Sequence, residues 1–154
     1  MIPLSMPKIR VLLVEDEPFI RGTFTRILRS LGCTEVREAP DGTEALAVLS
    51  FGFRPDLVLC DVRMAPMDGL GFLAHLRKSP DPVLAKTPVI MLTGATDEAS
   101  VRAARGLGVG GYLVKPVSPG ALAERVKQVL CTAPPSRSMT DSLGMPTATP
   151  RARM

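Results

Sequence analysis

The chain has 154 residues, of which 45% are hydrophobic and 22% charged, a composition that suits one globular domain. Its net charge of +4 includes no basic run that would indicate nucleic-acid binding, and no apolar run is long enough to span a membrane. One histidine excludes a histidine-based metal cluster or catalytic triad, and three cysteines without CxxC spacing predict reduced, mostly buried thiols in a cytoplasmic protein.

Short apolar runs alternate with amphipathic stretches along the chain. The apolar runs predict strands over 9–14, 35–39, 56–60, 88–92 and 111–114. Apolar residues spaced three and four apart predict a helix after each strand, over 18–31, 41–49, 69–78, 96–106 and 118–130. Five strand–helix units in alternation predict an α/β fold in which helices cover both faces of a five-stranded parallel sheet.

Local signals mark where several helices begin and end. Pro18 suits a first helical turn and Gly32 a helix end, while Asp41 and Ser118 are expected N-caps. The helix over 96–106 is expected to open with Thr96 as a cap and an acidic first turn. Its packed side is predicted to hold three alanines, Ala99, Ala103 and Ala104.

The alternation ends near residue 131. We expect one domain over 8–131, preceded by a short N-terminal extension, 1–7, that carries no signal-peptide pattern. Residues 132–154 are rich in Pro, Ser, Thr and Arg and lack periodic apolar positions, so we predict a disordered tail there.

Charged residues stand at the ends of three predicted strands. Glu15 and Asp16 follow the first strand, Asp61 the third and Lys115 the fifth. Because the carboxyl ends of parallel strands share one edge of the sheet, we expect these groups to meet in one crevice. Three carboxylates so close repel one another and need a cation, which suggests phosphoryl chemistry on Asp61.

Each of these signals has a plain structural explanation when taken singly. Glu15 and Asp16 could be no more than the acidic start of a helix, and Lys115 before Pro116 an ordinary turn. Thr93 could satisfy a turn and Tyr112 could be a core residue. Only a shared site explains all of them together.

Four motifs carry a family resemblance. They lie at 14–18, 61–69, 92–95 and 112–116, in order and each at a strand end. With this spacing the chain over about 8–131 resembles a bacterial response-regulator receiver domain of the chemotaxis-regulator type. The resemblance implies a flavodoxin-like, doubly wound (βα)5 fold with strand order 2-1-3-4-5, and a Lys115–Pro116 bond that favours the cis form.

Magnesium prefers oxygen ligands and takes one or two carboxylates while keeping waters. We therefore expect Asp16 and Asp61 to bind Mg²⁺ directly and Glu15 to act through a water. The resemblance implies that the backbone carbonyl of Arg63 completes the protein ligands. It also implies a two-component phosphorelay protein whose Asp61 accepts a phosphoryl group from a histidine kinase or a phosphotransfer protein.

Three further residues take roles at the same edge. Lys115 is a point charge that can pair first with Asp61 and then with its phosphate, and Thr93 can offer a hydroxyl to a phosphate oxygen. The resemblance implies that Thr93 and Tyr112 move together as a switch. A downstream protein is then expected on the face formed by 96–106, 111–114 and 118–130, where the exposed Arg102 and Arg105 suit an acidic partner.

Two residues depart from the family pattern. The proline expected four residues after the phosphorylated aspartate is displaced to Pro66, with Ala65 in its place. Arg63 puts a long cation beside the phosphoryl site, so we expect it to tune phosphate lifetime or Mg²⁺ affinity.

Two other function classes are compatible with parts of the sequence. We expect a signalling domain and not a turnover enzyme, with no membrane partner and no nucleic acid. One alternative is an Asp-nucleophile phosphatase on a similar sheet, although such enzymes usually carry a second aspartate where Arg63 stands. Another is a DNA-binding regulator that uses the basic tail, with salt-dependent binding.

Overall fold

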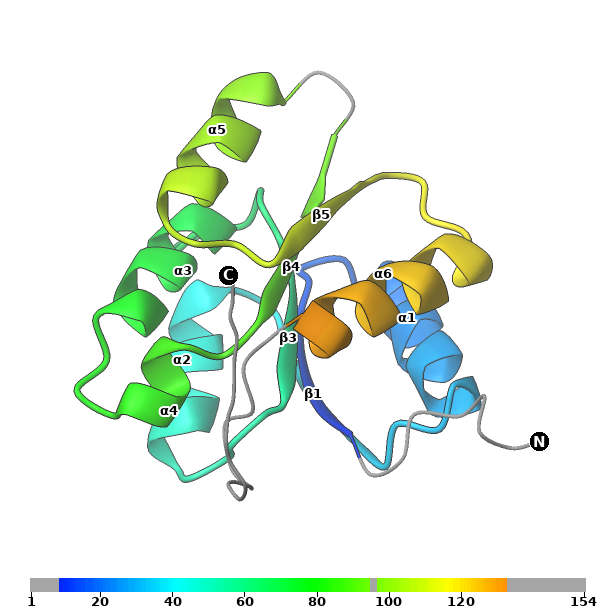
Figure 1. Cartoon of the computed structure of the whole chain (residues 1–154), viewed down its shortest axis with the longest axis horizontal. Helices are drawn as coiled ribbons and strands as arrows, with labels where there is room; N and C mark the ends of the chain where they lie inside the picture. The colour runs from blue at the N-terminus through cyan, green and yellow to red at the C-terminus, as the bar shows by residue number, and fades with distance from the viewer. Residues whose placement is uncertain (1–8, 95–96, 133–154) are drawn as a thin grey trace.

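The computed structural model describes residues 9–94 and 97–132. Its middle layer is a five-stranded parallel sheet with the order β2-β1-β3-β4-β5 (Figure 1). This confirms the predicted fold class and strand order. The strands are β1 (Arg10–Val14), β2 (Glu35–Ala39), β3 (Leu57–Asp61), β4 (Val89–Thr93) and β5 (Gly111–Val114).

The inner strands are buried on both faces. Every residue of β3 and β4 is buried, whereas the edge strands β2 and β5 each carry exposed residues. A parallel strand covered on both sides must be apolar throughout, which is why simple apolar runs predicted these strands. Both end one residue later than predicted, so Asp61 and Thr93 are the last residues of their strands.

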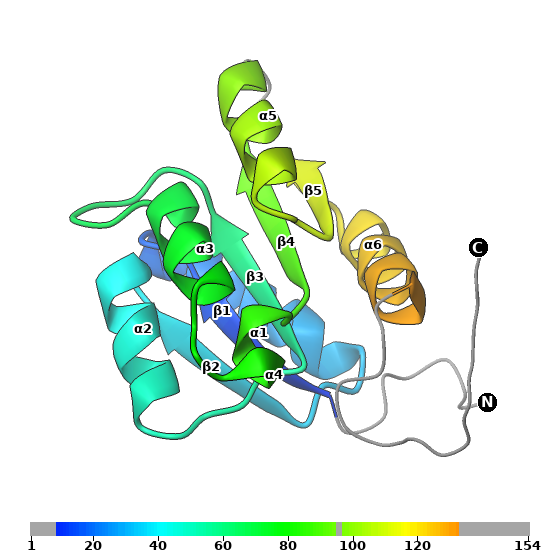
Figure 2. The same cartoon turned by 60° about the vertical axis from the view of Figure 1, so that its left-hand side comes forward.

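The helices form a layer on each face of the sheet. One face is covered by α1 (Pro18–Ser30) and α6 (Pro119–Thr132), and the other by the remaining helices (Figures 1 and 2). These are α2 (Gly42–Ser50), α3 (Gly69–Arg77), α4 (Pro82–Ala85) and α5 (Glu98–Gly106). Two apolar clusters follow this division, with Leu28 and Val126 in one and Phe72 and Leu76 in the other.

Most helix ends follow the predicted local signals. Pro18 occupies the first turn of α1, and Gly32 beyond its end has a φ of 98°. The Asp41 carboxylate accepts hydrogen bonds from two backbone N–H groups of α2, and the Ser118 hydroxyl accepts one from Ala121 at the start of α6. These caps depend on neighbours in the chain, which explains why they were predictable.

The strict alternation of five strands and five helices was wrong in one detail. The described residues contain a sixth helix, α4, which is one turn long and sits between α3 and β4. The Asp81 side chain caps it by accepting hydrogen bonds from Val83 and Leu84. A four-residue helix has no apolar periodicity to detect, so its only sequence signal is Asp81 followed by a proline.

The predicted packed side of α5 also needs correction. Of the three alanines expected there, Ala104 is buried, while Ala99 and Ala103 are exposed. The half-buried Val101 and Leu107 are spaced three residues on either side of Ala104 and define the packed stripe. Asp97 is the N-cap residue, but its side chain makes no cap hydrogen bond, and Thr96 lies outside the described residues.

The expected extension at 1–7 and all but the first residue of the expected tail lie outside the described residues. Across 9–94 and 97–132, no helix combines the length and the apolar character needed to cross a membrane. Cys33 and Cys60 are buried and Cys131 is exposed, and all three are free thiols.

Candidate functional site

The backbone brings the predicted site residues to one edge of the sheet. The ladder of hydrogen bonds continues one residue past several strands: the Glu15 N–H donates to Ala39 O (3.0 Å), and the Lys115 N–H donates to Thr93 O (2.9 Å). Because the ends of the strands are held in register, their first loop residues have fixed positions. This edge is where an open parallel sheet binds ligands.

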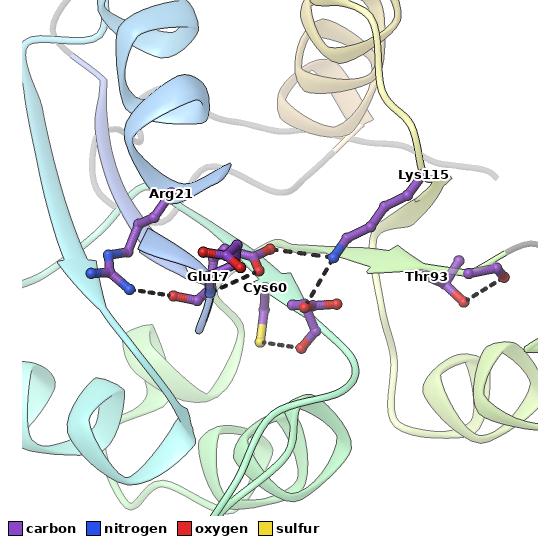
Figure 3. A network of polar contacts seen from close by, with 8 residues as sticks. Glu17, Arg21, Cys60, Thr93 and Lys115 are labelled. Carbon is purple, nitrogen blue, oxygen red and sulfur yellow. Dashed lines mark hydrogen bonds and ion pairs between the residues drawn. The ribbon is translucent and has the colours of Figure 1, made fainter. Parts of the chain in front are cut away.

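Lys115 connects the carboxylates at the centre of the site. Its Nζ lies 3.0 Å from Asp61 Oδ2 and 3.4 Å from Glu15 Oε1, and Figure 3 shows it reaching across from the end of β5 to both. Asp61 is 5% exposed and Glu15 only 1%, whereas Asp16 is exposed. The structure therefore brings Glu15, Asp16, Asp61 and Lys115 together, as the sequence predicted.

Burial and charge set the protonation of this cluster. Burial, followed by repulsion from Asp61, raises the pKa of Glu15 from 4.5 to about 7, although Lys115 acts in the opposite direction. Burial would lower the pKa of Lys115, but its hydrogen bond to Asp61 and the charges of Asp61 and Glu15 raise it overall. Lys115 is thus held as a cation, while Glu15 takes up a proton near neutral pH.

The acidic residues have the geometry of a cation site. Glu15, Asp16 and Asp61 each place one carboxylate oxygen within 4.8 Å of the others. Glu15 Oε1 is buried and makes no hydrogen bond beyond its 3.4 Å ion pair with Lys115, while Oε2 accepts a long bond from the Glu17 N–H (3.3 Å). An oxygen-only cluster of three carboxylates, with one lysine as its close cation, fits a hard divalent cation such as Mg²⁺.

Arg21 supports the acidic loop and was missed in the sequence. Its Nη1 donates to the backbone carbonyl of Glu15 (2.7 Å; Figure 3). Its Nε donates to Glu38 Oε1 (3.2 Å). The guanidinium of α1 thereby ties the loop after β1 to the edge strand β2. No local sequence pattern predicts this contact, because it depends on how α1 packs against two strands.

Thr93 is the last residue of β4, and Tyr112 lies in β5, the strand that precedes Lys115. The Thr93 hydroxyl donates to the Gly94 carbonyl (3.2 Å) and stands apart from the Lys115 contacts in Figure 3. Tyr112 is half-buried, and Arg105 of α5 both donates to its hydroxyl and lies over its ring, 5.3 Å from the centroid. A pocket of about 400 Å³ between α5 and β5 is lined by both Thr93 and Tyr112.

Arg63 does not point into the acidic cluster in this structure. Its Nη2 lies 3.2 Å from Asp97 Oδ1 at the start of α5, and its side chain is 79% exposed. The use of its carbonyl as a metal ligand stays a prediction. The loop that follows contains a cis peptide at Ala65–Pro66, the displaced proline, and Lys115–Pro116 is also cis, as the resemblance implied.

Comparisons with known proteins identify the family of this chain. The model of the response regulator receiver domain matches residues 11–127. The chain therefore belongs to the response regulator receiver family, and it is a signalling domain of the two-component type.

Two curated relatives illustrate the match. Regulator of RpoS from Escherichia coli K12 is 41% identical over 108 residues, which cover 70% of this chain and 30% of the relative. Probable transcriptional regulator ycf27 from Cyanophora paradoxa is 37% identical over 142 residues, which cover 92% of this chain and 56% of the relative. The chain thus spans 30% and 56% of the length of these two relatives.

Solved structures support the same fold. A putative response regulator from Chloroflexus aurantiacus has a TM-score of 0.74 and 32% identity, covering 80% of this chain and 98% of that one. The chemotaxis response regulator CheY4 of Vibrio cholerae has a TM-score of 0.71 and 34% identity, covering 79% of this chain and 98% of that one. These similarities confirm the flavodoxin-like receiver fold.

Proposed function

We propose that this chain is a phosphorylatable switch, in which Asp61 accepts a phosphoryl group from a phosphohistidine on a histidine kinase or a phosphotransfer protein. The observation that carries the proposal is the placement of Asp61. Its buried carboxylate has an oxygen within 4.8 Å of oxygens of Glu15 and Asp16, which can hold a cation with it, and lies 3.0 Å from the lysine ammonium. We assign the receiver unit to residues 8–131, with flanking segments at 1–7 and 132–154.

The chemistry follows from these positions. A carboxylate oxygen of Asp61 attacks phosphorus, and the P–N bond to histidine breaks as the departing imidazole takes up a proton. Asp16 and Asp61 would hold Mg²⁺ directly, with Glu15 acting through a water and the Arg63 carbonyl as a further ligand. The bound ion would supply charge neutralisation for the phosphoryl oxygens. Lys115, which lies 3.0 Å from Asp61 Oδ2, provides a second positive charge.

The switch uses groups already beside the site. In this proposal the Thr93 hydroxyl leaves the Gly94 carbonyl for a phosphate oxygen, and Tyr112 turns into the pocket between α5 and β5. The pocket supports this step because Thr93 and Tyr112 both line it. The α5–β5–α6 face then changes shape and binds a downstream protein, for which the exposed Arg102 supplies a cationic contact.

Phosphorylation is directly testable with acetyl phosphate and Mg²⁺. We expect a mass increase of one phosphoryl group on the wild-type protein and none on Asp61→Asn. Asp81→Asn is the matched control, because Asp81 caps α4 away from the site and asparagine can keep that cap. Labelling of Asp61→Asn, or labelling unchanged by a chelator, would contradict the proposal.

The phosphatase alternative depends on the residue two positions after the nucleophile. Here that residue is Arg63, a guanidinium in place of the second carboxylate that such an enzyme uses. The structure directs its side chain to Asp97. We therefore propose a signalling role without substrate turnover, which a phosphatase assay with a soluble phosphate ester checks. The DNA-binding alternative depends on the basic tail, of which all but residue 132 lies outside the described residues.

A further inference from the structure

The contact between Arg63 and Asp97 joins two loops that are 34 residues apart. Arg63 belongs to the loop that follows the phosphoacceptor strand β3, and Asp97 is the N-cap residue of α5. The guanidinium Nη2 lies 3.2 Å from Asp97 Oδ1. This pair therefore links the chemistry of Asp61 to the helix on the proposed output face.

The Asp97 carboxylate is poorly satisfied apart from this contact. Its side chain is 7% exposed, it makes no cap hydrogen bond to α5, and Oδ2 is buried without a hydrogen-bond partner. A buried carboxylate needs a counter-charge, because desolvation penalises the ionised form. Arg63 supplies that charge, so Asp97 attracts the guanidinium away from the acidic cluster.

Arg63 is also within reach of a group attached to Asp61. Two residues of extended chain span at most about 7 Å, so the long Arg63 side chain can turn back to the Asp61 carboxylate. Its side chain is 79% exposed, so little packing holds it in place. The planar guanidinium binds phosphate through two parallel hydrogen bonds, and a phosphoryl group carries more charge than one carboxylate.

We propose that Arg63 is a positioning residue for the phosphoryl group, and that Asp97 competes with that group for Arg63. This inference rests on the proposed phosphorylation of Asp61. In the unmodified protein the guanidinium pairs with Asp97. When Asp61 carries a phosphoryl group, Arg63 turns to its oxygens and leaves Asp97 without a counter-charge at the start of α5. The exchange thereby transmits the state of Asp61 to that helix.

Beryllofluoride tests the competition, because it adds to a carboxylate with the tetrahedral shape of a phosphoryl group. Its affinity is measured by fluorine NMR at saturating Mg²⁺ for wild type, Arg63→Ala, Asp97→Asn and the double variant. We expect Arg63→Ala to bind about two- to fivefold more weakly and Asp97→Asn about two- to fivefold more tightly, as suits one partly exposed ion pair. In the Arg63→Ala background, Asp97→Asn should have no effect.

Glu98→Gln is the matched control, because it removes one negative charge from the next residue of the same helix. It should leave the affinity within the error of wild type, which separates the loss of this pair from a general change in charge. An equal effect of Asp97→Asn with and without Arg63 would overturn the proposal. So would unchanged or weaker binding by Asp97→Asn.

A second measurement needs no change at Asp97. The side-chain Nε–H resonance of Arg63, assigned by its loss in Arg63→Ala, should shift when beryllofluoride is added to the wild-type protein with Mg²⁺. An unmoved resonance would overturn the exchange. If the wild-type protein bound no beryllofluoride at all, the proposed function itself would be contradicted. If it bound beryllofluoride but the effects of Arg63→Ala and Asp97→Asn were independent, only this inference would be contradicted.

Discussion

Glu15 and Asp16 are neighbours in the chain, yet burial gives them different chemistry. Successive residues at the end of a strand point to opposite sides, so Glu15 is buried beside Lys115 while Asp16 is exposed. Burial raises the pKa of Glu15 to about 7, a change that no inspection of the acidic pair would suggest. A cation bound to this cluster therefore competes with the proton on Glu15 near neutral pH.

The raised pKa of Glu15 predicts a pH-dependent stability in the absence of divalent cations. The folded protein binds this proton more tightly than the unfolded chain does. The stabilisation is therefore fully present below pH 4.5 and is lost as the pH rises through about 7. We expect a fall of about 1–3 kcal/mol in the free energy of unfolding. Urea unfolding in EDTA at pH 5 and pH 8 measures it.

Substitutions separate this effect from other titrations. Glu15→Gln mimics the protonated form, so its stability should fall less between the same two pH values than that of wild type. Glu44→Gln, an exposed residue in the first turn of α2, should keep the wild-type dependence. Identical pH profiles for wild type and Glu15→Gln would show that Glu15 titrates normally.

At the scale of single elements, α3 begins in direct contact with the phosphoacceptor strand. A Cβ atom at Gly69 would lie 2.1 Å from the backbone oxygen of Asp61, and the Gly69 N–H donates to Val62 O (2.8 Å). Only glycine permits this approach. The glycine thus sets how closely α3 lies beneath the residue that carries the chemistry.

Gly69→Ala should therefore destabilise the protein by about 1–3 kcal/mol, because it forces β3 and α3 apart. It should also weaken Mg²⁺ binding by moving Asp61. Gly106→Ala is the matched control: nothing lies within 4 Å of its Cβ position in α5, so it should stabilise by about 0.4–1 kcal/mol. Thermal unfolding and a magnesium titration measure both effects. A neutral Gly69→Ala would refute the tight approach.

Arg77 at the end of α3 holds three segments together. Its guanidinium donates to the carbonyls of Ala85 and Thr87 around the end of α4, and to those of Leu107 and Gly108 after α5. The end of α5 is therefore attached to α3 and α4, whereas its start is attached through Asp97. This arrangement allows the two ends of α5 to respond separately.

Arg77→Met should lower the free energy of unfolding by about 1–3 kcal/mol, because the apolar stem remains while several carbonyls lose their donor. Amide exchange should rise around 107–109 more than around 98–101. Lys78→Met changes the exposed neighbouring residue, so it should alter neither the free energy of unfolding nor the amide hydrogen exchange around 107–109. Uniformly raised exchange would show that Arg77 does not act locally.

At the scale of the whole molecule, the two apolar clusters of the described residues together draw on residues between Ile9 and Leu130. The segment 132–154 lacks periodic apolar positions, so we expect a chain limited to 8–132 to unfold within about 2 °C of the full chain and to bind beryllofluoride equally well. The same truncation should abolish any DNA binding if the tail carries it. A lower unfolding temperature would place part of the stabilising contacts outside this range.

Sequence periodicity predicted the sheet well and the helices less completely. Buried parallel strands are apolar by necessity, and caps such as Asp41 and Ser118 involve only residues within one turn. The short α4 was missed because a helix of one turn has no apolar periodicity. The packed side of α5 was misplaced because this helix has few apolar residues, so their pattern does not define which side packs against the sheet. For the site, the strand-end rule brought Asp61 and Lys115 together correctly.

The order of apolar runs and strand-end charges by itself determined the fold class, the strand order through the family resemblance, and which residues share the crevice. These properties follow from local periodicity and from the topology of parallel sheets. Only the tertiary structure decided that Glu15 is buried with a raised pKa, that Arg21 holds its loop, and that Arg63 pairs with Asp97. These features depend on desolvation and on contacts between segments that are distant in the chain. Neither the burial of a side chain nor a long-range contact can be read from local sequence.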